Sequence, residues 1–503
     1  MIERMAEADY IIVGGGTAGC VVARRLLEWT DARVLLLEAG PDYPRWALDP
    51  PLASLRLRRH WSWPLVTVPQ PRLGGRTIAF PMGRVVGGSS SINAMMFVPG
   101  APADHDDWER AGGPDWGRGV IAEEMRRIFG GGPGSLAAPC APRYRAEFSE
   151  RFLAAAEAEG LRRVAGLHAG HGEACGYFDV FQLEGRRAGV ATTYLAPWRG
   201  HPRLALRTRR RVRRLLLEGP RVVGVEVGDG RAARPLRARR GVILTAGTFH
   251  SPHLLLRSGI GPPAELEEAR VPVRHALLAV GRGLEDHVGA VLRHPAEKAS
   301  PGRRARWLVA TLEYLRGRDG VMRSNCCEAG GFFATEPGDE RPTIEIVSHF
   351  QSERHDEVSL DCILLRPHSR GTVRLNPGDP EGPPRIDPAY LEDERDRSTL
   401  GAGVRRARDI LRRIFPASGL LPVLPDRGAE DAFLAAQGRT NYHPTGTCRM
   451  GATGVVDARL QVHGLEGLWV GDASAIPASP TGHTAVAAIL FGERAARFAA
   501  GGR

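Results

Sequence analysis

Two histidines near the C-terminal end have sequence contexts that are typical of functional loops. His443 precedes a proline in a segment rich in glycine and threonine, and His483 lies within Pro480–Thr484. The unperturbed pKa of an imidazole lies near neutral pH, so a neutral histidine can accept the proton of a substrate hydroxyl. Most of the chain's 16 histidines are expected to be structural, but loop positions carry function more often than packing. Both histidines are therefore candidates for acid–base chemistry.

A second chemical signal lies at the N-terminal end, where Gly14, Gly16 and Gly19 form a Gly-x-Gly-x-x-Gly sequence. The apolar run Tyr10–Val13 before it predicts a buried parallel strand, and a helical pattern follows it. Gly14 permits a tight turn, Gly16 lets the backbone approach a pyrophosphate, and Gly19 allows close helix–strand packing. Backbone N–H groups at the start of the helix then face the phosphates.

The next apolar run, Val34–Leu37, ends on Glu38, 19 positions after Gly19. A carboxylate at this spacing can accept hydrogen bonds from an adenosine ribose. It also disfavours a 2′-phosphate, which leaves FAD or NAD rather than NADP. The alternative is an ordinary tight turn. The order strand, turn, helix, strand and acid favours a bound dinucleotide.

The histidines and the glycine turn need further elements to position them. One candidate is Gly83–Ala94, a loop rich in glycine and serine. Its N–H groups and small hydroxyls are suited to surrounding a polar ligand. A flexible linker is the alternative, but apolar runs flank the loop on both sides. The proline-rich stretch before it, which contains Trp61 and Trp63, predicts a lid or cofactor cover.

Length and composition restrict the class of protein. A chain of 503 residues, 43% hydrophobic and 25% charged, predicts a folded protein with at least two domains. The net charge of +11 is carried almost wholly by arginine, with Lys298 as the only lysine, and the charge is spread along the chain. The densest run, Arg207–Arg214, has apolar residues within and around it, which indicates a solvated strand rather than a nucleic-acid site.

Cysteines and apolar runs add further exclusions. Seven cysteines without a Cys-x-x-Cys pair disfavour structural zinc and a disulfide framework. Adjacent Cys326 and Cys327 could be redox-active, although buried thiols are expected. No run approaches the ~18 apolar residues of a membrane span, and the N-terminus has no secretory pattern, so a cytoplasmic protein is expected.

The motifs together resemble the glucose–methanol–choline family of flavin oxidoreductases, and they follow the family order over nearly the whole chain. The segments similar to those of the family are Gly14–Gly19, Gly83–Ala94, Ala101–Trp108, Gly247–Pro252 with Ser258–Gly261, Ser369–Gly371, His443–Gly451 and Val470–Ser474.

This resemblance implies an FAD-dependent enzyme that oxidises the CH–OH group of an alcohol by hydride transfer to flavin N5. It places the catalytic base on His443, so flavin reduction is expected to rise with pH through the histidine range. It implies a hydrogen-bonding role beside the flavin for His483, where the family carries His or Asn. Some members attach FAD covalently through a histidine at the position of Ile92, so non-covalent FAD is expected. Gly283 replaces a family asparagine in Val280–His287.

The motifs and the resemblance together predict which residues bind the cofactor and which other groups the site holds. No metal is expected. The electron acceptor, oxygen or a redox carrier, is left open, and so is the alcohol. The expected cofactor residues are Gly14, Gly16, Thr17, Ala18, Gly19, Glu38, Trp61, Arg84, Val85, Gly88, Asn93, Ala94, Val212, Ala246, Asp472, Ala473 and Thr484.

The predicted fold class is α/β. A Rossmann-like FAD-binding domain over residues 1–290, with cover segments near 41–110, precedes a substrate domain over 291–430 built on an antiparallel sheet. Residues 431–503 are expected to return to the FAD domain with both catalytic histidines.

Two other function classes remain open. The family also holds hydroxynitrile lyases and fatty-acid photodecarboxylases. Cys327 could match a cysteine of the latter, but no arginine occupies 343–350, where their arginine would be expected. A flavoprotein without enzymatic activity would leave His443 and His483 unexplained.

Overall fold

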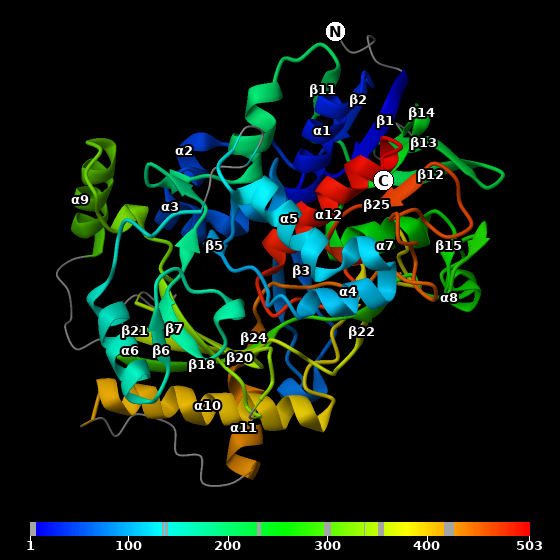
Figure 1. Cartoon of the computed structure of the whole chain (residues 1–503). Coiled ribbons are helices and arrows are strands. Elements are labelled where there is room, and N and C mark those ends of the chain that lie inside the picture. Colours follow the sequence, from blue (N-terminus) through cyan, green and yellow to red (C-terminus); the bar gives the residue numbers. More distant parts are fainter. Residues whose placement is uncertain are drawn as a thin grey trace.

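The computed structural model describes residues 7–132, 135, 139–228, 233–295, 303–336, 338–350, 357–416 and 427–502. Lys298 lies outside these ranges. Two sheets dominate the molecule, one near each end of the view in Figure 1. The predicted α/β class is confirmed.

The first sheet surrounds the N-terminal motif. Its parallel strands, in spatial order, are β11 (Leu204–Arg207), β2 (Val34–Leu37), β1 (Glu7–Val13), β14 (Arg234–Leu244) and β25 (Leu468–Val470). The central strands are apolar without alternation because helices cover both faces. In β2 every residue is buried. The glycine turn follows β1 and leads directly into α1 (Thr17–Trp29).

The C-terminal segment rejoins this sheet. β25 pairs with β14, and α12 (Thr484–Ala499) packs against α1, as Figure 1 shows for the red and blue helices. Arg25 of α1 forms a buried ion pair of 2.8 Å with Glu493 of α12. Because the C-terminal segment returns to this sheet, His483, the residue before α12, lies near the helix that follows the glycine turn.

The apolar residues of Leu204–Leu217 and Val222–Val227 predict two strands joined in a hairpin near Gly219 and Pro220. The prediction for the first strand is wrong in extent. The structure has two strands there, since β11 ends at Arg207 and β12 (Val212–Glu218) begins after a turn in which Arg209 has a φ of 54°. β11 adds to one edge of the parallel sheet, whereas β12 and β13 (Arg221–Val227) form the expected hairpin at the other edge.

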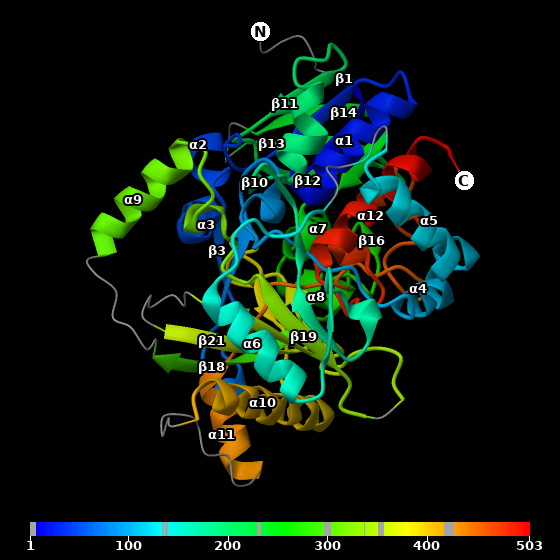
Figure 2. The same cartoon turned by 60° about the vertical axis from the view of Figure 1, so that its left-hand side comes forward.

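The second sheet has the predicted antiparallel character, with one parallel pair at its edge. Its strands in spatial order are β24 (Gly438–Thr440), β18 (Val288–Pro295), β21 (Glu357–Leu364), β20 (Ile344–His349), β19 (Ala329–Phe333), β7 (Ala174–Tyr177) and β6 (Arg162–Val164). Helices α10 (Glu394–Ile414) and α6 (Glu147–Ala158) cover one face of it, as Figure 2 shows.

This sheet draws strands from both sides of residue 290, because β6 and β7 precede it and β24 follows the predicted end at 430. The alternating pattern over Thr372–Leu375 predicts a further strand of this region. In the structure it forms β22 (Gly371–Arg374), which belongs to a separate small sheet with β17 (Arg282–Leu284) and β23 (Arg385–Asp387). Sheet membership depends on pairing between distant segments, which strand patterns do not encode.

The cover segment near 41–110 is more regular than its prolines suggest. It contains α2 (Arg45–Leu48), α3 (Pro51–Leu57), the hairpin of β3 (Ser62–Val66) and β4 (Ala79–Gly83), and the start of α4 (Asp104–Gly112). Pro51 stands at the first position of α3, where its missing N–H is tolerated.

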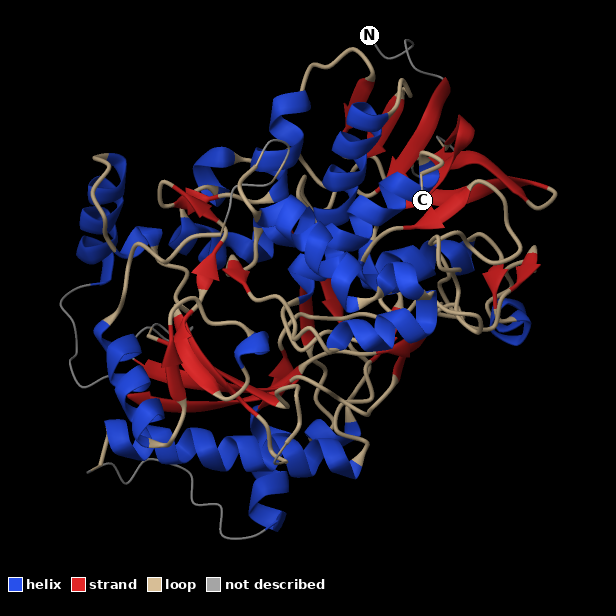
Figure 3. Cartoon of the chain, viewed as in Figure 1, coloured by secondary structure: helices blue, strands red, loops and turns tan. Residues whose placement is uncertain are grey.

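The remaining elements, visible as helices and strands in Figure 3, complete the chain. They are β5 (Met96–Phe97), α5 (Arg118–Phe129), β8 (Asp179–Val180), β9 (Gln182–Leu183), β10 (Arg186–Arg187), α7 (Gly247–Arg257), β15 (Ile260–Gly261), α8 (Pro263–Glu268), β16 (His275–Ala276), α9 (Arg303–Leu315) and α11 (Arg427–Gln437). Over the ranges described, no helix has the length and apolarity needed to cross a bilayer.

Candidate active site

One large cavity of about 1170 Å³ is lined by the loops of the parallel sheet and by a face of the antiparallel sheet. Its volume exceeds the usual ligand pocket of about 300–1,000 Å³, so it has room for a dinucleotide together with a small substrate. The predicted site residues that line it are Gly16, Thr17, Ala18, Gly88, Asn93, Ala94, Ala246, His443, Asp472, Ala473, His483 and Thr484.

The glycine turn fits a pyrophosphate. Helix α1 begins after Gly16 without a capping side chain and without an acid in its first turn, so its first N–H groups are available to a ligand. A Cβ on Gly16 would meet no atom closer than 3.8 Å, whereas a Cβ on Gly19 would lie 1.9 Å from the carbonyl oxygen of Gly14. Gly16 thus opens onto the cavity, and Gly19 lets helix and strand pack closely.

Glu38 lies at the end of β2, almost fully buried. Its two carboxylate oxygens accept hydrogen bonds from Gly15 N at 2.8 Å and Gly40 N at 2.7 Å. Burial raises the pKa of Glu38 to about 7. Together with Gly14, Ala246 and Val212, Glu38 lines a small adjoining cavity of about 90 Å³. This small cavity is where the sequence predicts the far end of the dinucleotide to lie.

Four of the predicted cofactor residues line neither cavity. Gly19 packs inside the glycine turn, and Val85 is fully buried. The Trp61 ring packs against the apolar cluster that contains Val85 and Ile92. The guanidinium of Arg84 lies 4.5 Å from the centre of the Trp63 ring, and Trp63 lines the cavity. These residues support the cavity wall.

Arg187 fixes the glycine- and serine-rich loop and was not predicted. Its guanidinium donates hydrogen bonds to Asn93 Oδ1 at 2.7 Å and to the carbonyl oxygens of Ser90 and Asn93 at 2.9 and 2.7 Å. Burial lowers its pKa to about 10. An arginine in a short hairpin carries no motif, and only its position beneath the loop reveals this role.

Three histidines meet at the cavity. The rings of His443 and His483 lie 4.5 Å apart, centre to centre, and His443 Nδ1 lies 3.1 Å from His287 Nδ1. Burial, followed by the neighbouring His483 and His287, holds the pKa of His443 well below its usual range. Burial and the neighbouring His483 lower the pKa of His287 to about 3. His443 is therefore neutral at physiological pH.

In the sequence, His287 stands out only as the last residue of the family-like segment Val280–His287. The structure shows that it lies beside the proposed base. It is fully buried and precedes β18. Asp286 beside it accepts hydrogen bonds from the backbone N of His443 at 2.8 Å, from Thr440 Oγ1 at 2.7 Å and from the Tyr390 hydroxyl. This buried carboxyl group, with its pKa raised to about 7 by burial, ties the His443 loop to β18 and β24.

Glu345 is another residue that the sequence reading missed. It is completely buried on β20, and its carboxylate oxygens lie 3.2 and 3.1 Å from His483 Nε2. An acid within the apolar run 343–347 was a usable signal, because a buried carboxylate needs a partner. The partner is 138 positions away in the sequence.

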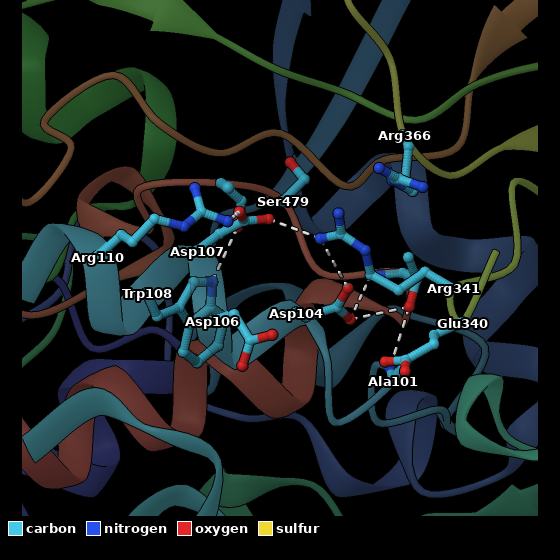
Figure 4. A network of polar contacts seen from close by, with 12 residues as sticks. Ala101, Asp104, Asp106, Asp107, Trp108, Arg110, Glu340, Arg341, Arg366 and Ser479 are labelled. Atoms are coloured by element: carbon cyan, nitrogen blue, oxygen red, sulfur yellow. Dashed lines mark hydrogen bonds and ion pairs between the residues drawn. The ribbon is translucent and has the colours of Figure 1, made fainter. Parts of the chain in front are cut away.

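The loop that carries His483 is held by a second polar network, and Figure 4 shows the Asp104, Asp107 and Arg341 side chains of this network. Asp104 is buried and accepts hydrogen bonds from Thr481 N and Thr481 Oγ1, both at 2.8 Å. Arg341 reaches toward Asp104 at 3.9 Å and binds Asp107 at 2.6 Å. The His483 backbone N donates to Val98 O at 2.8 Å. His483 is thus fixed from its own loop and from Glu345.

We expect Asp104→Ala to lower the free energy of unfolding by about 2–4 kcal/mol, because it leaves buried donors of Thr481 without an acceptor. Asp106→Ala is the matched control. Asp106 is exposed and pairs with Arg118 on the surface, so its loss is expected to change stability little. Denaturant unfolding of both variants measures the difference. Equal unfolding midpoints would contradict a positioning role for Asp104.

Comparison with known proteins identifies the architecture. The family model "GMC oxidoreductase" matches residues 8–289 with its N-terminal part and 367–492 with its C-terminal part. The chain belongs to the GMC oxidoreductase family. These two segments contain the glycine turn, the glycine- and serine-rich loop and all three histidines of the site.

Individual relatives of this GMC oxidoreductase cover nearly its whole length. It is 33% identical to an alcohol dehydrogenase [acceptor] of Pseudomonas putida over 97% of this chain and 95% of that protein. It is 32% identical to the mitochondrial choline dehydrogenase of Mus musculus over 97% and 89% of the two chains. The crystal structure of pyridoxine 4-oxidase from Mesorbium loti superposes with a TM-score of 0.84 at 30% identity, covering 97% and 98%.

A formate oxidase structure superposes with a TM-score of 0.86 at 26% identity over 98% of both chains. The cofactor of this GMC oxidoreductase is FAD, and the residues of the glycine turn fit it. The predicted family, fold class and cofactor type are therefore confirmed. The roles of the individual site residues stay predictions.

Proposed function

We propose that this GMC oxidoreductase oxidises the CH–OH group of an alcohol to a carbonyl, with His443 as the base that accepts the hydroxyl proton. The observation that carries the proposal is a neutral His443 in the cavity that FAD fits, with one ring nitrogen already engaged by His287. Bound FAD would supply the acceptor for the hydride that leaves the substrate carbon. The alcohol dehydrogenase of P. putida supports this reaction class.

The contact between His443 and His287 constrains the tautomers. A hydrogen bond between two Nδ1 atoms needs one ring to donate and the other to accept, and we propose that His443 is the donor. His287 Nδ1 then accepts the Nδ1–H of His443. This arrangement leaves His443 Nε2 with its lone pair, as a base requires. His287 is a positioning residue in this scheme.

His483 has a different assignment. We propose that His483 Nε2 is the donor in its contact with the Glu345 side chain. We propose that Glu345 orients His483 and that His483 binds the substrate oxygen. Proton acceptance then rests on His443 alone, since His443 has no carboxylate partner among the contacts of its ring in the described structure.

The pH dependence follows from the site's burial. A rise of flavin reduction through the ordinary histidine range was expected from the sequence. With the pKa of His443 held well below that range, the base is neutral throughout it. We therefore expect the rate constant of flavin reduction to be flat from about pH 6 to 9 and to fall only in acid. Stopped-flow reduction across this range tests it, and a rise centred near pH 6.5 would contradict the assigned pKa shift.

Lyase chemistry and a non-enzymatic flavoprotein are the competing functions. Cys327 lines the cavity, as a photodecarboxylase cysteine could, but nothing else favours that reaction. Anaerobic addition of primary alcohols separates the classes. Alcohol oxidation bleaches the visible absorbance of FAD, whereas lyase turnover and simple binding leave it oxidised. Parallel dye-reduction and oxygen-uptake assays identify the electron acceptor.

We expect acid precipitation of the purified protein to release intact FAD into the supernatant. Some family members bind FAD covalently through a histidine at the position of Ile92, and Ile92 has a buried hydrocarbon side chain that cannot form such a bond. Absorbance of supernatant and pellet measures the release. Yellow colour that stays with the pellet after denaturation would show a covalent link elsewhere.

A further inference from the structure

Helix α9 (Arg303–Leu315) stands at the edge of the molecule beside α2 and α3, in both views of the chain (Figures 1 and 2). One side of it contacts the protein. Ala310 and Tyr314, one turn apart, pack with Leu52 of α3 and Met322 in a small apolar cluster. This contact anchors α9 and leaves its opposite side to the surroundings.

The opposite side is also apolar. Leu308, Leu312 and Leu315 follow each other at helical spacing with 63%, 40% and 74% of their surface exposed, and Val309 is 55% exposed. Eleven large hydrophobic residues are exposed in the described structure, and four of them fall within these eight positions. Single exposed apolar residues are ordinary, but a cluster indicates an interaction surface.

Two neighbouring elements carry further exposed apolar side chains. Trp46 of α2 is 77% exposed and Leu183 of β9 is 59% exposed. Arg187, in the same hairpin as Leu183, bonds the carbonyl oxygens of Leu48 and Asp49 at the end of α2. Arg323, in the turn against which α9 packs, bonds the carbonyl oxygen of Glu184 in that hairpin. The three elements therefore adjoin.

The charges around these residues are mostly positive. By sequence, residues 303–319 contain five arginines and two acids, and Glu184 beside Leu183 is a further exposed acid. Arg316 and Arg318 at the end of α9 are exposed, and so are Arg45 beside Trp46 and Arg186 beside Leu183. Exposed leucines and a tryptophan flanked by arginines are the pattern of a helix that lies in the headgroup region of a membrane. A second copy would bring like charges together.

We propose that this surface, made of Trp46, Leu183, Leu308, Val309, Leu312 and Leu315, docks the protein on an anionic lipid bilayer. The leucines enter the boundary between headgroups and acyl chains, and the arginines bind lipid phosphates. Helix α3, on which α9 packs, also lines the large cavity through Leu52 and Leu55. Docking therefore places that wall of the cavity close to the membrane. The docking proposal does not depend on the alcohol oxidation proposed above.

The test is co-sedimentation of the FAD-loaded protein with phosphatidylcholine vesicles, with and without about 30% phosphatidylglycerol. We expect binding to the anionic vesicles that weakens at about 0.5 M NaCl. Leu308→Ser/Leu312→Ser/Leu315→Ser should lower the partition coefficient about tenfold or more. Leu278→Ser is the matched control, because Leu278 is 71% exposed outside this surface. Arg316→Gln/Arg318→Gln should weaken binding to anionic vesicles only.

The controls separate this proposal from its alternatives. Flavin content and the thermal transition must match wild type in every variant. Wild-type protein that stays in the supernatant with anionic vesicles, or a triple serine variant that binds like wild type, would overturn the proposal. A dimer that dissociates in the triple variant without vesicle binding would identify a second copy as the occupant. Vesicle binding without alcohol-driven flavin bleaching would leave docking intact and refute the alcohol oxidation.

Discussion

His443→Ala is expected to keep its FAD and to slow flavin reduction by alcohol by 10²–10⁴-fold, which is about 2.7–5.4 kcal/mol of barrier. The substitution removes the only imidazole in the site whose free nitrogen is proposed to accept the hydroxyl proton. Asp286 is expected to keep the loop in place, because it binds the backbone N–H of residue 443 and not the side chain. Stopped-flow reduction at saturating alcohol measures the effect without interference from reoxidation.

Variants of the neighbouring residues make this comparison specific. His483→Asn should be milder, since an amide can still donate to the substrate oxygen, and His483→Ala should be slower than His483→Asn. His275→Ala serves as the histidine control, because its ring bonds a backbone carbonyl outside the cavity. If His443→Ala reduces its flavin as fast as wild type, the proposed base is wrong, whatever the fold.

Glu38→Ala is expected to raise the dissociation constant of FAD about 10- to 150-fold, from the loss of hydrogen bonds to a charged acceptor worth roughly 1.5–3 kcal/mol. The carboxylate would bind the adenosine ribose, and it also orders the glycine turn through Gly15 N and Gly40 N. Turnover per bound flavin should change little. Equilibrium dialysis of the apoprotein with FAD measures the affinity.

Asp42→Ala is the control for this variant. Asp42 lies four residues farther along the same loop, half-exposed, and pairs with Arg199 at 2.6 Å. Its removal should leave FAD affinity close to wild type. A Glu38→Ala protein that retains full flavin but no longer turns over would contradict the cofactor assignment. It would show that Glu38 takes part in the reaction instead.

The sequence by itself determined the dinucleotide unit. Strand, glycine turn, helix, strand and acid are contiguous, so their geometry depends on local dihedral preferences and on the fixed rise of each element. That is why β2 has its predicted bounds and why Gly16 opens onto the cavity. The loop positions of His443 and His483 were also readable, because proline and glycine mark loops without any tertiary context.

Only the tertiary structure decided what surrounds these groups. Glu345 reaches His483 from a strand of the other sheet, and His287 reaches His443 across 156 positions. Such contacts depend on how strands pair and how two sheets pack, and a one-dimensional pattern does not specify either. The low pKa of His443 has the same origin, because burial is a property of the assembled cavity. The exposure of the α9 leucines could not be predicted for a related reason. An apolar helical repeat predicts an apolar helix face, but only the packed fold shows which face stays uncovered.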